Sequence, residues 1–155
     1  FYYDRADVRK ARDLFEAVAK EKPELMQVET FVYDLTDVRR QVVSDRAREL
    51  LPLVRTDPAA RAEFLAGIVE MDRVLAASPY FRLDHYLKLA AELDPAHGPE
   101  AVKRMYTTWV EPSGVKRTLD DYAHRQLAGL MDYYYGRWTQ FFAVNPIPPC
   151  ESAEK

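Results

Sequence analysis

The chain lacks most of the residues from which catalytic, metal-binding and phosphate-binding motifs are built. It has 5 glycines and 1 cysteine in 155 residues, and its 3 histidines lie far apart. The lone Cys150 cannot form an internal disulfide, and His85, His97 and His124 show no metal-ligand spacing. No glycine-rich phosphate loop and no nucleophile motif occurs. We therefore predict no metal site, no cofactor and no catalytic residue within this chain.

Long apolar runs and an excess of one charge are also absent. No apolar run approaches the ~18 residues that a membrane-spanning helix requires. The net charge of −3 provides no broad basic surface for nucleic acid. Hydrophobic residues make up 48% and charged residues 30%, as in ordinary globular domains. We therefore predict a globular domain that binds neither membrane nor nucleic acid.

The apolar residues that are present recur at steps of three and four, which is the period of an α-helix. Prolines separate these stretches, and Asp57-Pro58 is typical of a helix start. The pattern predicts an all-α fold, a compact bundle of about six helices with short loops. We expect these helices at residues 6–20, 33–51, 58–77, 81–93, 99–107 and 119–142.

The predicted bundle accounts for nearly the whole chain. We expect a single α-helical domain over residues 1–150 and a disordered tail over 151–155, after a proline-rich stretch. The chain begins with Phe1 and carries no signal peptide, so we expect it to be a fragment of a larger multidomain protein.

The stretch around which the chain is organised is 119–142, LDDYAHRQLAGLMDYYYGRWTQFF. Its apolar and aromatic residues fall along one side of a helix, which favours a core helix. Gly129 would stand in mid-helix and allow another backbone to come close, and Gly136 would end or bend the helix.

A polar group stands on the helix expected at 33–51. Asp37 and Arg40 are three residues apart and can pair on one helical face, and Gln41 lies beside that face. The spacing is compatible with a surface ion pair of little energetic weight and with a polar interface to a missing domain. Both interpretations stay open from spacing alone.

Two segments carry a resemblance to a known family. LDDYAHRQLAGLMDYYYGRW (119–138) resembles a segment of the α-N-acetylglucosaminidases, glycoside hydrolase family 89, and YDLTDVRRQ (33–41) is similar to a second one. The resemblance implies the C-terminal helical domain of such a hydrolase, packed on a catalytic barrel of the same polypeptide. Asp37, Arg40 and Gln41 would then contact that barrel. Both catalytic glutamates of these retaining enzymes belong to the barrel, so this chain alone would have no hydrolase activity.

The resemblance also implies residues that bind substrate. Trp109 precedes the 119–142 stretch as a tryptophan does in the family, and Tyr122 and Leu119 match residues at the start of the family's segment. They would line the pocket for a terminal α-linked N-acetylglucosamine, with the flat face of Trp109 stacked on the sugar. From the residues alone, burial of Trp109 and Tyr122 in the domain core competes with this interpretation.

The resemblance places the parent protein in a secreted, periplasmic or lysosomal setting. A different class of function stays open as the alternative. The segment LAAELDP (89–95) looks like the end of a tetratricopeptide-repeat helix, which would fit a stand-alone helical protein-interaction module. That architecture needs several stacked units at a fixed period, and the sequence shows no convincing internal repeat.

Overall fold

The computed structural model describes residues 3–107 and 126–147, and this part of the chain is helical. Its elements are α1 (Arg5–Glu21), η1 (Pro23–Gln27), α2 (Glu29–Leu50), α3 (Pro58–Leu75), η2 (Pro79–Phe81), α4 (Leu83–Leu93), α5 (Gly98–Thr107) and α6 (Met131–Val144), where η denotes a short 3-10 helix. No β-strand occurs within these residues. The prediction of an all-α fold with six helices is confirmed.

The helices begin where the sequence offers caps for their free backbone N–H groups. The carboxylate of Asp4 accepts a hydrogen bond of 2.8 Å from the Ala6 N–H at the start of α1. The carboxylate of Asp57 accepts from the N–H groups of the second and third residues of α3. Pro58 is the first residue of α3, where its missing N–H costs nothing.

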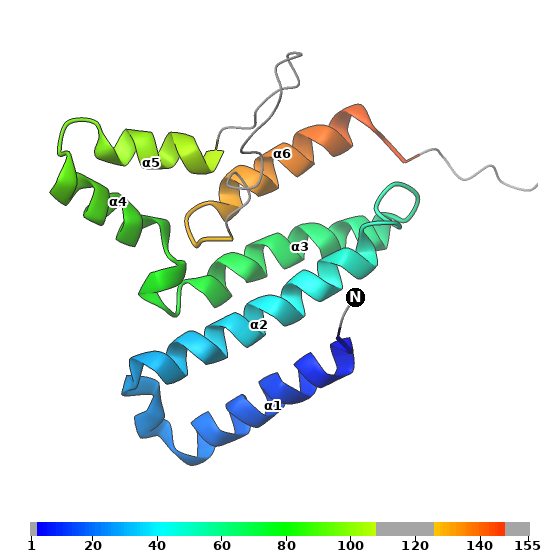
Figure 1. Ribbon diagram of the computed structural model, residues 1–155. Helices are drawn as coiled ribbons and strands as arrows, with labels where there is room; N and C mark the ends of the chain where they lie inside the picture. The colour runs from blue at the N-terminus through cyan, green and yellow to red at the C-terminus, as the bar shows by residue number, and fades with distance from the viewer. Residues whose placement is uncertain (1–2, 108–125, 148–155) are drawn as a thin grey trace, which may run out of the picture.

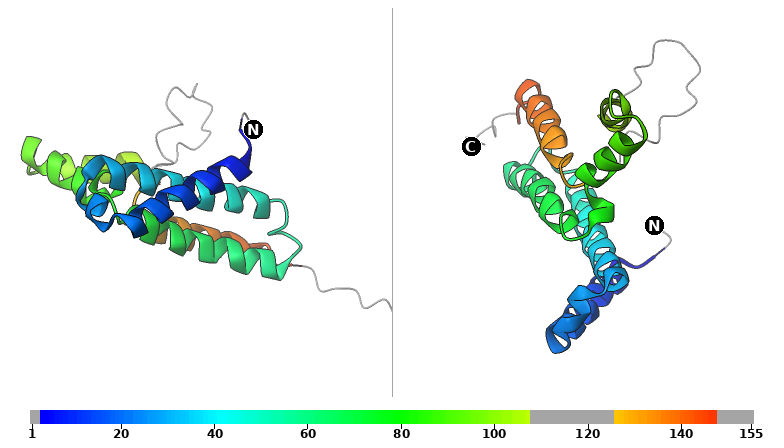
Figure 2. Two further views of the ribbon diagram at one scale, coloured as in Figure 1. Left: turned by 90° about the horizontal axis from the view of Figure 1, so that it is seen from below. Right: turned by 90° about the vertical axis from the view of Figure 1, so that its left-hand side faces the viewer.

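Helices α1, α2, α3 and α6 form one array, and the hairpin of α4 and α5 lies at one end of it. Helix α2 packs on both α1 and α3, and α3 packs on α6 (Figure 1). Helices α4 and α5 pack on each other and lie beside the end of the array at which α3 ends and α6 begins. The views in Figure 2 show α1 and α6 on opposite sides of the α2–α3 pair.

The core consists of two clusters of buried apolar side chains. The first joins α3, the start of α4, α5, and the start of α6 with the residues before it. It is made of Met71, Leu75, Leu83, Tyr106, Leu127, Ala128, Leu130 and Met131. The second joins α2, α3 and α6, and it is made of Leu50, Val54, Ala60, Phe64 and Phe142. Helix α1 contributes no fully buried residue, so α2, α3 and α6 are the centre of the fold.

The predicted helix at 119–142 is wrong for residues 126–130, which form a non-helical strap before α6 that ends in a turn at Gly129 and Leu130. The N–H of Ala128 donates to the carbonyl of Phe81 at 2.8 Å, and the carbonyl of Ala128 accepts from the N–H of Leu83 at 2.9 Å. These bonds to the η2–α4 junction replace the helical pattern. Gly129 has a φ of +90°, a value outside the right-handed helix. Residues 119–125 of the prediction lie outside the described residues.

Gly136 does not end the helix, because α6 runs from Met131 to Val144 with this glycine in its interior; a bend at this position stays a prediction. Although residues 126–130 are not helical, apolar residues at both ends of the described part of this stretch are buried as predicted. Leu127 and Leu130 are buried, and Phe142 is buried at the other end of α6. The apolar pattern therefore predicted which residues are buried even where the backbone is not helical.

None of the helices in the described ranges combines the length and the apolar character that crossing a bilayer requires.

Candidate functional site

The candidate site is a polar stripe along one face of α2. Its residues are spaced by three and four positions, so they lie one above another along the helix. They are Asp37, Arg40, Gln41, Ser44, Asp45 and Arg48. Ser44 and Asp45 are buried and the guanidinium side chain of Arg40 is only 25% exposed. Because buried polar groups need partners, this stripe must be tied to other elements.

Arg40 joins the stripe to the strap before α6. Its Nε and Nη2 donate to Oδ1 of Asp37 at 2.8 and 2.7 Å, and its Nη1 donates to Oε1 of Gln126 at 2.7 Å. The amide nitrogen of Gln126 donates to the hydroxyl of Ser44 at 3.0 Å. One planar guanidinium therefore links a carboxylate of its own helix to an amide 86 residues away in sequence.

Gln41 joins the stripe to the start of the chain. Its side-chain amide donates to the phenol oxygen of Tyr3 at 2.8 Å and to Oδ1 of Asp45 at 2.9 Å. The Tyr3 hydroxyl donates to the same Asp45 oxygen at 2.7 Å. That hydrogen bond to a carboxylate raises the pKa of Tyr3, because losing the proton would remove the bond and place two anions side by side.

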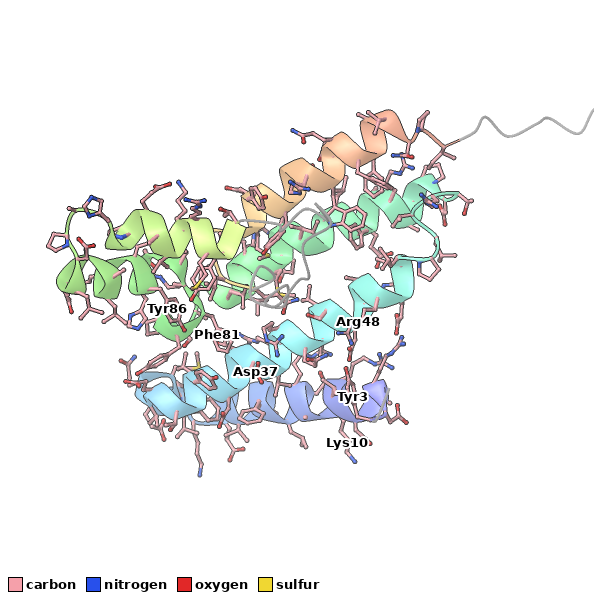
Figure 3. The ribbon with its side chains drawn as sticks, turned by 45° about the horizontal axis from the view of Figure 1, so that its top comes forward. Tyr3, Lys10, Asp37, Arg48, Phe81 and Tyr86 are labelled. Atoms are coloured by element: carbon pink, nitrogen blue, oxygen red, sulfur yellow. The ribbon has the colours of Figure 1, made fainter. Side chains whose placement is uncertain are left out.

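A groove of about 500 Å³ opens along the stripe. One wall is the polar face of α2, and the other wall is aromatic and comes from Tyr80, Phe81 and Tyr86. Tyr33 of α2 packs against the aromatic wall, with its ring 4.9 Å from that of Phe81 and tilted by 30°. Figure 3 shows Asp37 and Arg48 along α2, Tyr3 beside α2 near the start of α1, and Phe81 and Tyr86 on the neighbouring η2–α4 segment.

The groove is better suited to contact with a binding partner than to catalysis. Arg40 and Gln41 already donate to partners within the domain. The side chain of Asp37 is 46% exposed, and Tyr33 and Tyr80 are 41% and 40% exposed, so these three residues are accessible to a partner. Aromatic faces beside a carboxylate suit a polar protein surface or a sugar.

No metal chemistry emerges from the described part of the chain. Within residues 3–107 and 126–147, no group of three or more metal-ligating side chains is close enough to hold an ion. His85 packs edge-on against Tyr80 and Tyr86, and His97 lies 3.5 Å from Asp94. The third histidine, His124, lies outside the described residues.

The predicted site residues fall into two groups. Asp37, Arg40 and Gln41 do lie together on α2, although Arg40 and Gln41 reach different partners. The residues expected at the sugar pocket, Trp109, Leu119 and Tyr122, lie outside the described residues. Their predicted role remains a prediction.

Sequence reasoning missed four members of the network: Ser44 and Asp45 on α2, Gln126 before α6, and Tyr3. Ser44 lies four residues after Arg40, and this spacing alone places it on the same face. Gln126 stood within the organising stretch, but nothing local to it indicates a partner on α2. Tyr3 belongs to the aromatic run Phe1-Tyr2-Tyr3, and nothing local to it indicates its partner Asp45, which is 42 residues away.

Two comparisons with known proteins indicate the same family. Residues 1–145 match the model of the family described as "Alpha-N-acetylglucosaminidase (NAGLU) C-terminal domain". The chain is also similar to human alpha-N-acetylglucosaminidase, with 30% identity over 159 residues that cover 90% of this chain and 20% of the human protein. The chain thus spans about one fifth of the length of that relative. No solved structure matched the chain.

Proposed function

Because the chain belongs to the alpha-N-acetylglucosaminidase (NAGLU) C-terminal domain family, we propose that it is the C-terminal helical domain of an α-N-acetylglucosaminidase-like glycoside hydrolase. In this role it packs on a catalytic barrel of the same polypeptide and supplies part of the pocket for a terminal α-linked N-acetylglucosamine. The family match over residues 1–145 is the observation that carries the proposal.

The proposed domain does no bond-breaking chemistry of its own. Retaining glycosidases use two carboxyl groups about 5–5.5 Å apart, one as nucleophile and one as acid and base. We place both on the barrel and none in this chain. The domain's contribution is to bind and orient the sugar, since correct placement lowers the barrier for the groups that react. No metal or organic cofactor is required for this role.

The residues proposed to meet the sugar are Trp109, Leu119 and Tyr122. An indole face stacks well on the apolar C–H face of a pyranose, and its N–H remains free to donate a hydrogen bond. A phenol and an aliphatic side chain would complete the wall, one polar and one apolar. Sugar pockets combine these features because each pyranose has an apolar face and a polar edge.

The surface proposed to meet the barrel includes Asp37, Arg40 and Gln41. The neighbouring rings of Tyr33 and Tyr80 support this assignment, because they lie 5.9 Å apart and are both about two-fifths exposed. Adjacent exposed aromatic rings are typical of contact surfaces. By the same resemblance, we propose a secreted, periplasmic or lysosomal setting for the parent protein.

The test is turnover of 4-nitrophenyl N-acetyl-α-D-glucosaminide by the full-length gene product that contains this chain. We expect hydrolysis by the wild type, and for Trp109→Ala a fall in kcat/KM of about tenfold or more with little change in Tm. Tyr135→Ala, which alters an exposed aromatic residue on α6, is the control and should keep wild-type turnover.

Two results would contradict the proposal. The first is a full-length protein without any α-N-acetylglucosaminidase activity, whose reading frame encodes no barrel; an interaction module would then be the better interpretation. The second is a Trp109→Ala variant that unfolds the domain while its surviving folded fraction keeps full activity, which would make Trp109 a core residue.

A further inference from the structure

A second hollow in the surface adjoins the groove at the start of α2. It has a volume of about 310 Å³, and it is lined by Glu29, Thr30, Tyr33 and Asp34 of α2 and by Tyr80 of η2. Tyr33 and Tyr80 line the groove as well, so the two aromatic rings belong to both depressions. All five residues of this acidic hollow come from the two elements that lie side by side at this end of the array (Figure 1).

The two aromatic rings are held in place by contacts within the domain. The ring of Tyr80 meets that of Tyr33 edge to face, and Tyr33 packs against Phe81 on its other contact. The hydroxyl of Tyr80 donates a hydrogen bond to the carboxylate of Glu29, which raises the pKa of Tyr80 because loss of the proton would place two anions side by side. Rings that are already positioned lose little conformational freedom when a partner covers them.

The charge of the acidic hollow is negative and is not balanced within the described domain. Glu29 and Asp34 are exposed, and no Lys, Arg or His among residues 3–107 and 126–147 forms an ion pair with either. The dipole of α2 favours Glu29 in its first turn, whereas Asp34 lies beyond that turn. Asp34 is also three residues from Asp37, a spacing at which like charges disfavour a helix, and the nearby cation Arg40 is already bound to Asp37.

We propose that the acidic hollow is the docking site for a basic side chain, Arg or Lys, on the barrel of the parent polypeptide. A cation at this point would pair with the carboxylates of Glu29 and Asp34 and lie against the faces of the two tyrosine rings. A neutral sugar would leave the negative charge unbalanced, so a basic protein segment fits better than a glycan. The inference rests on the proposed function, in which the α2 face meets the barrel. The family consists of C-terminal domains, and four-fifths of the human relative lies outside the matched region.

The test is site-specific photo-crosslinking in the full-length gene product. The photoreactive residue p-benzoyl-L-phenylalanine replaces Thr30, an exposed residue of the acidic hollow. In the control protein it replaces Tyr135, an exposed residue of α6. Crosslinked peptides are identified by mass spectrometry after irradiation. We expect position 30 to crosslink within the same polypeptide to a barrel segment in which Arg or Lys lies next to the crosslinked residue, and we expect position 135 not to reach that segment.

The role of charge is tested by Asp34→Lys in the protein that carries the photoreactive residue at position 30. Because it would place two cations together, we expect the crosslink yield to fall by about tenfold. Glu92→Lys reverses an exposed carboxylate on α4 and is the matched control, with an unchanged yield. Replacing the identified basic residue by Glu in the Asp34→Lys protein should restore the yield. If circular dichroism shows that Asp34→Lys does not fold, Asp34→Asn, which removes the charge and keeps the size, is measured in its place.

Several results would overturn the inference. They are a crosslink from position 30 only to a second copy of the protein, only to this domain or to no protein at all, and an equal yield with and without Asp34→Lys. Turnover of 4-nitrophenyl N-acetyl-α-D-glucosaminide by the wild type separates this failure from that of the proposed function. A wild type without glycosidase activity would refute the proposed function, and with it the barrel as the partner. An active enzyme whose crosslink yield is unaffected by Asp34→Lys would refute the docking site alone.

Discussion

Substitution by alanine should change the free energy of unfolding in opposite directions at Gly129 and Gly136. Gly129 lies in the strap with a φ of +90°, and a Cβ added there would stand 3.5 Å from the Cβ of Leu83. Gly136 lies inside α6 with nothing within 4 Å of an added Cβ. The first site is limited by backbone conformation, and the second has open space and helical geometry.

The magnitudes follow from these geometries. A non-glycine residue forced into the left-handed region costs roughly 1–2 kcal/mol, so Gly129→Ala should lower the free energy of unfolding by about that amount. Alanine is favoured over glycine in a helix interior by about 0.5–1 kcal/mol, so Gly136→Ala should raise it. The spread of about 2 kcal/mol corresponds to Tm values about 4–8 °C apart for a domain of this size.

The assay is urea unfolding of the wild type and both variants, followed by far-ultraviolet circular dichroism. Gly67→Ala in α3, where an added Cβ also meets nothing within 4 Å, is the control for a stabilising change. Equal midpoints for Gly129→Ala and the wild type would refute the strap conformation, and a destabilised Gly136→Ala would refute an α6 that continues past this glycine.

Three further changes test the caps, the core and the polar stripe. Asp57→Ala should destabilise the chain by about 1 kcal/mol in the same urea assay, because α3 loses its cap; an unchanged midpoint would contradict the capping role. Phe64→Ala should cost about 3–5 kcal/mol, because this buried ring packs edge-on against Trp138 at 4.8 Å, and a cost below 1 kcal/mol would show that this cluster is not core. Tyr3→Phe should reduce the loss of stability at alkaline pH. The hydrogen bond to Asp45 raises the pKa of Tyr3, so the stabilisation that this tyrosine gives the folded state is fully present below about pH 10. It is lost as the pH rises through the folded-state pKa. The check is Tm from pH 8 to 11, and identical alkaline limbs in both proteins would show that the bond to Asp45 is not made.

Local signals in the sequence were sufficient for most of the helices. Asp57-Pro58 marks the start of α3 because a cap and a proline act within one turn. The apolar stripe of 119–142 correctly indicated that Leu130 and Phe142 are buried. Its period could not show that residues 126–130 leave the helix, because the bonds that hold them reach Phe81 and Leu83, more than 40 residues earlier.

The polar stripe on α2 could be predicted only where its contacts are local in the sequence. Asp37 and Arg40 pair within one helical turn, so their spacing is visible in the sequence. The partner Gln126 is 86 residues away, and no local rule connects the two. Sequence patterns predict which face of a helix is polar, whereas tertiary packing decides what that face binds.

We propose that this domain forms part of a sugar pocket on a catalytic barrel. The most direct measurement is a crystal structure of the full-length protein with N-acetylglucosamine bound. We predict that the ring of Trp109 stacks on the sugar within about 4 Å, that Tyr122 or Leu119 contacts it, and that the α2 face around Asp37 lies against the barrel. A sugar enclosed by barrel residues alone, with this helical domain turned away from it, would contradict the account.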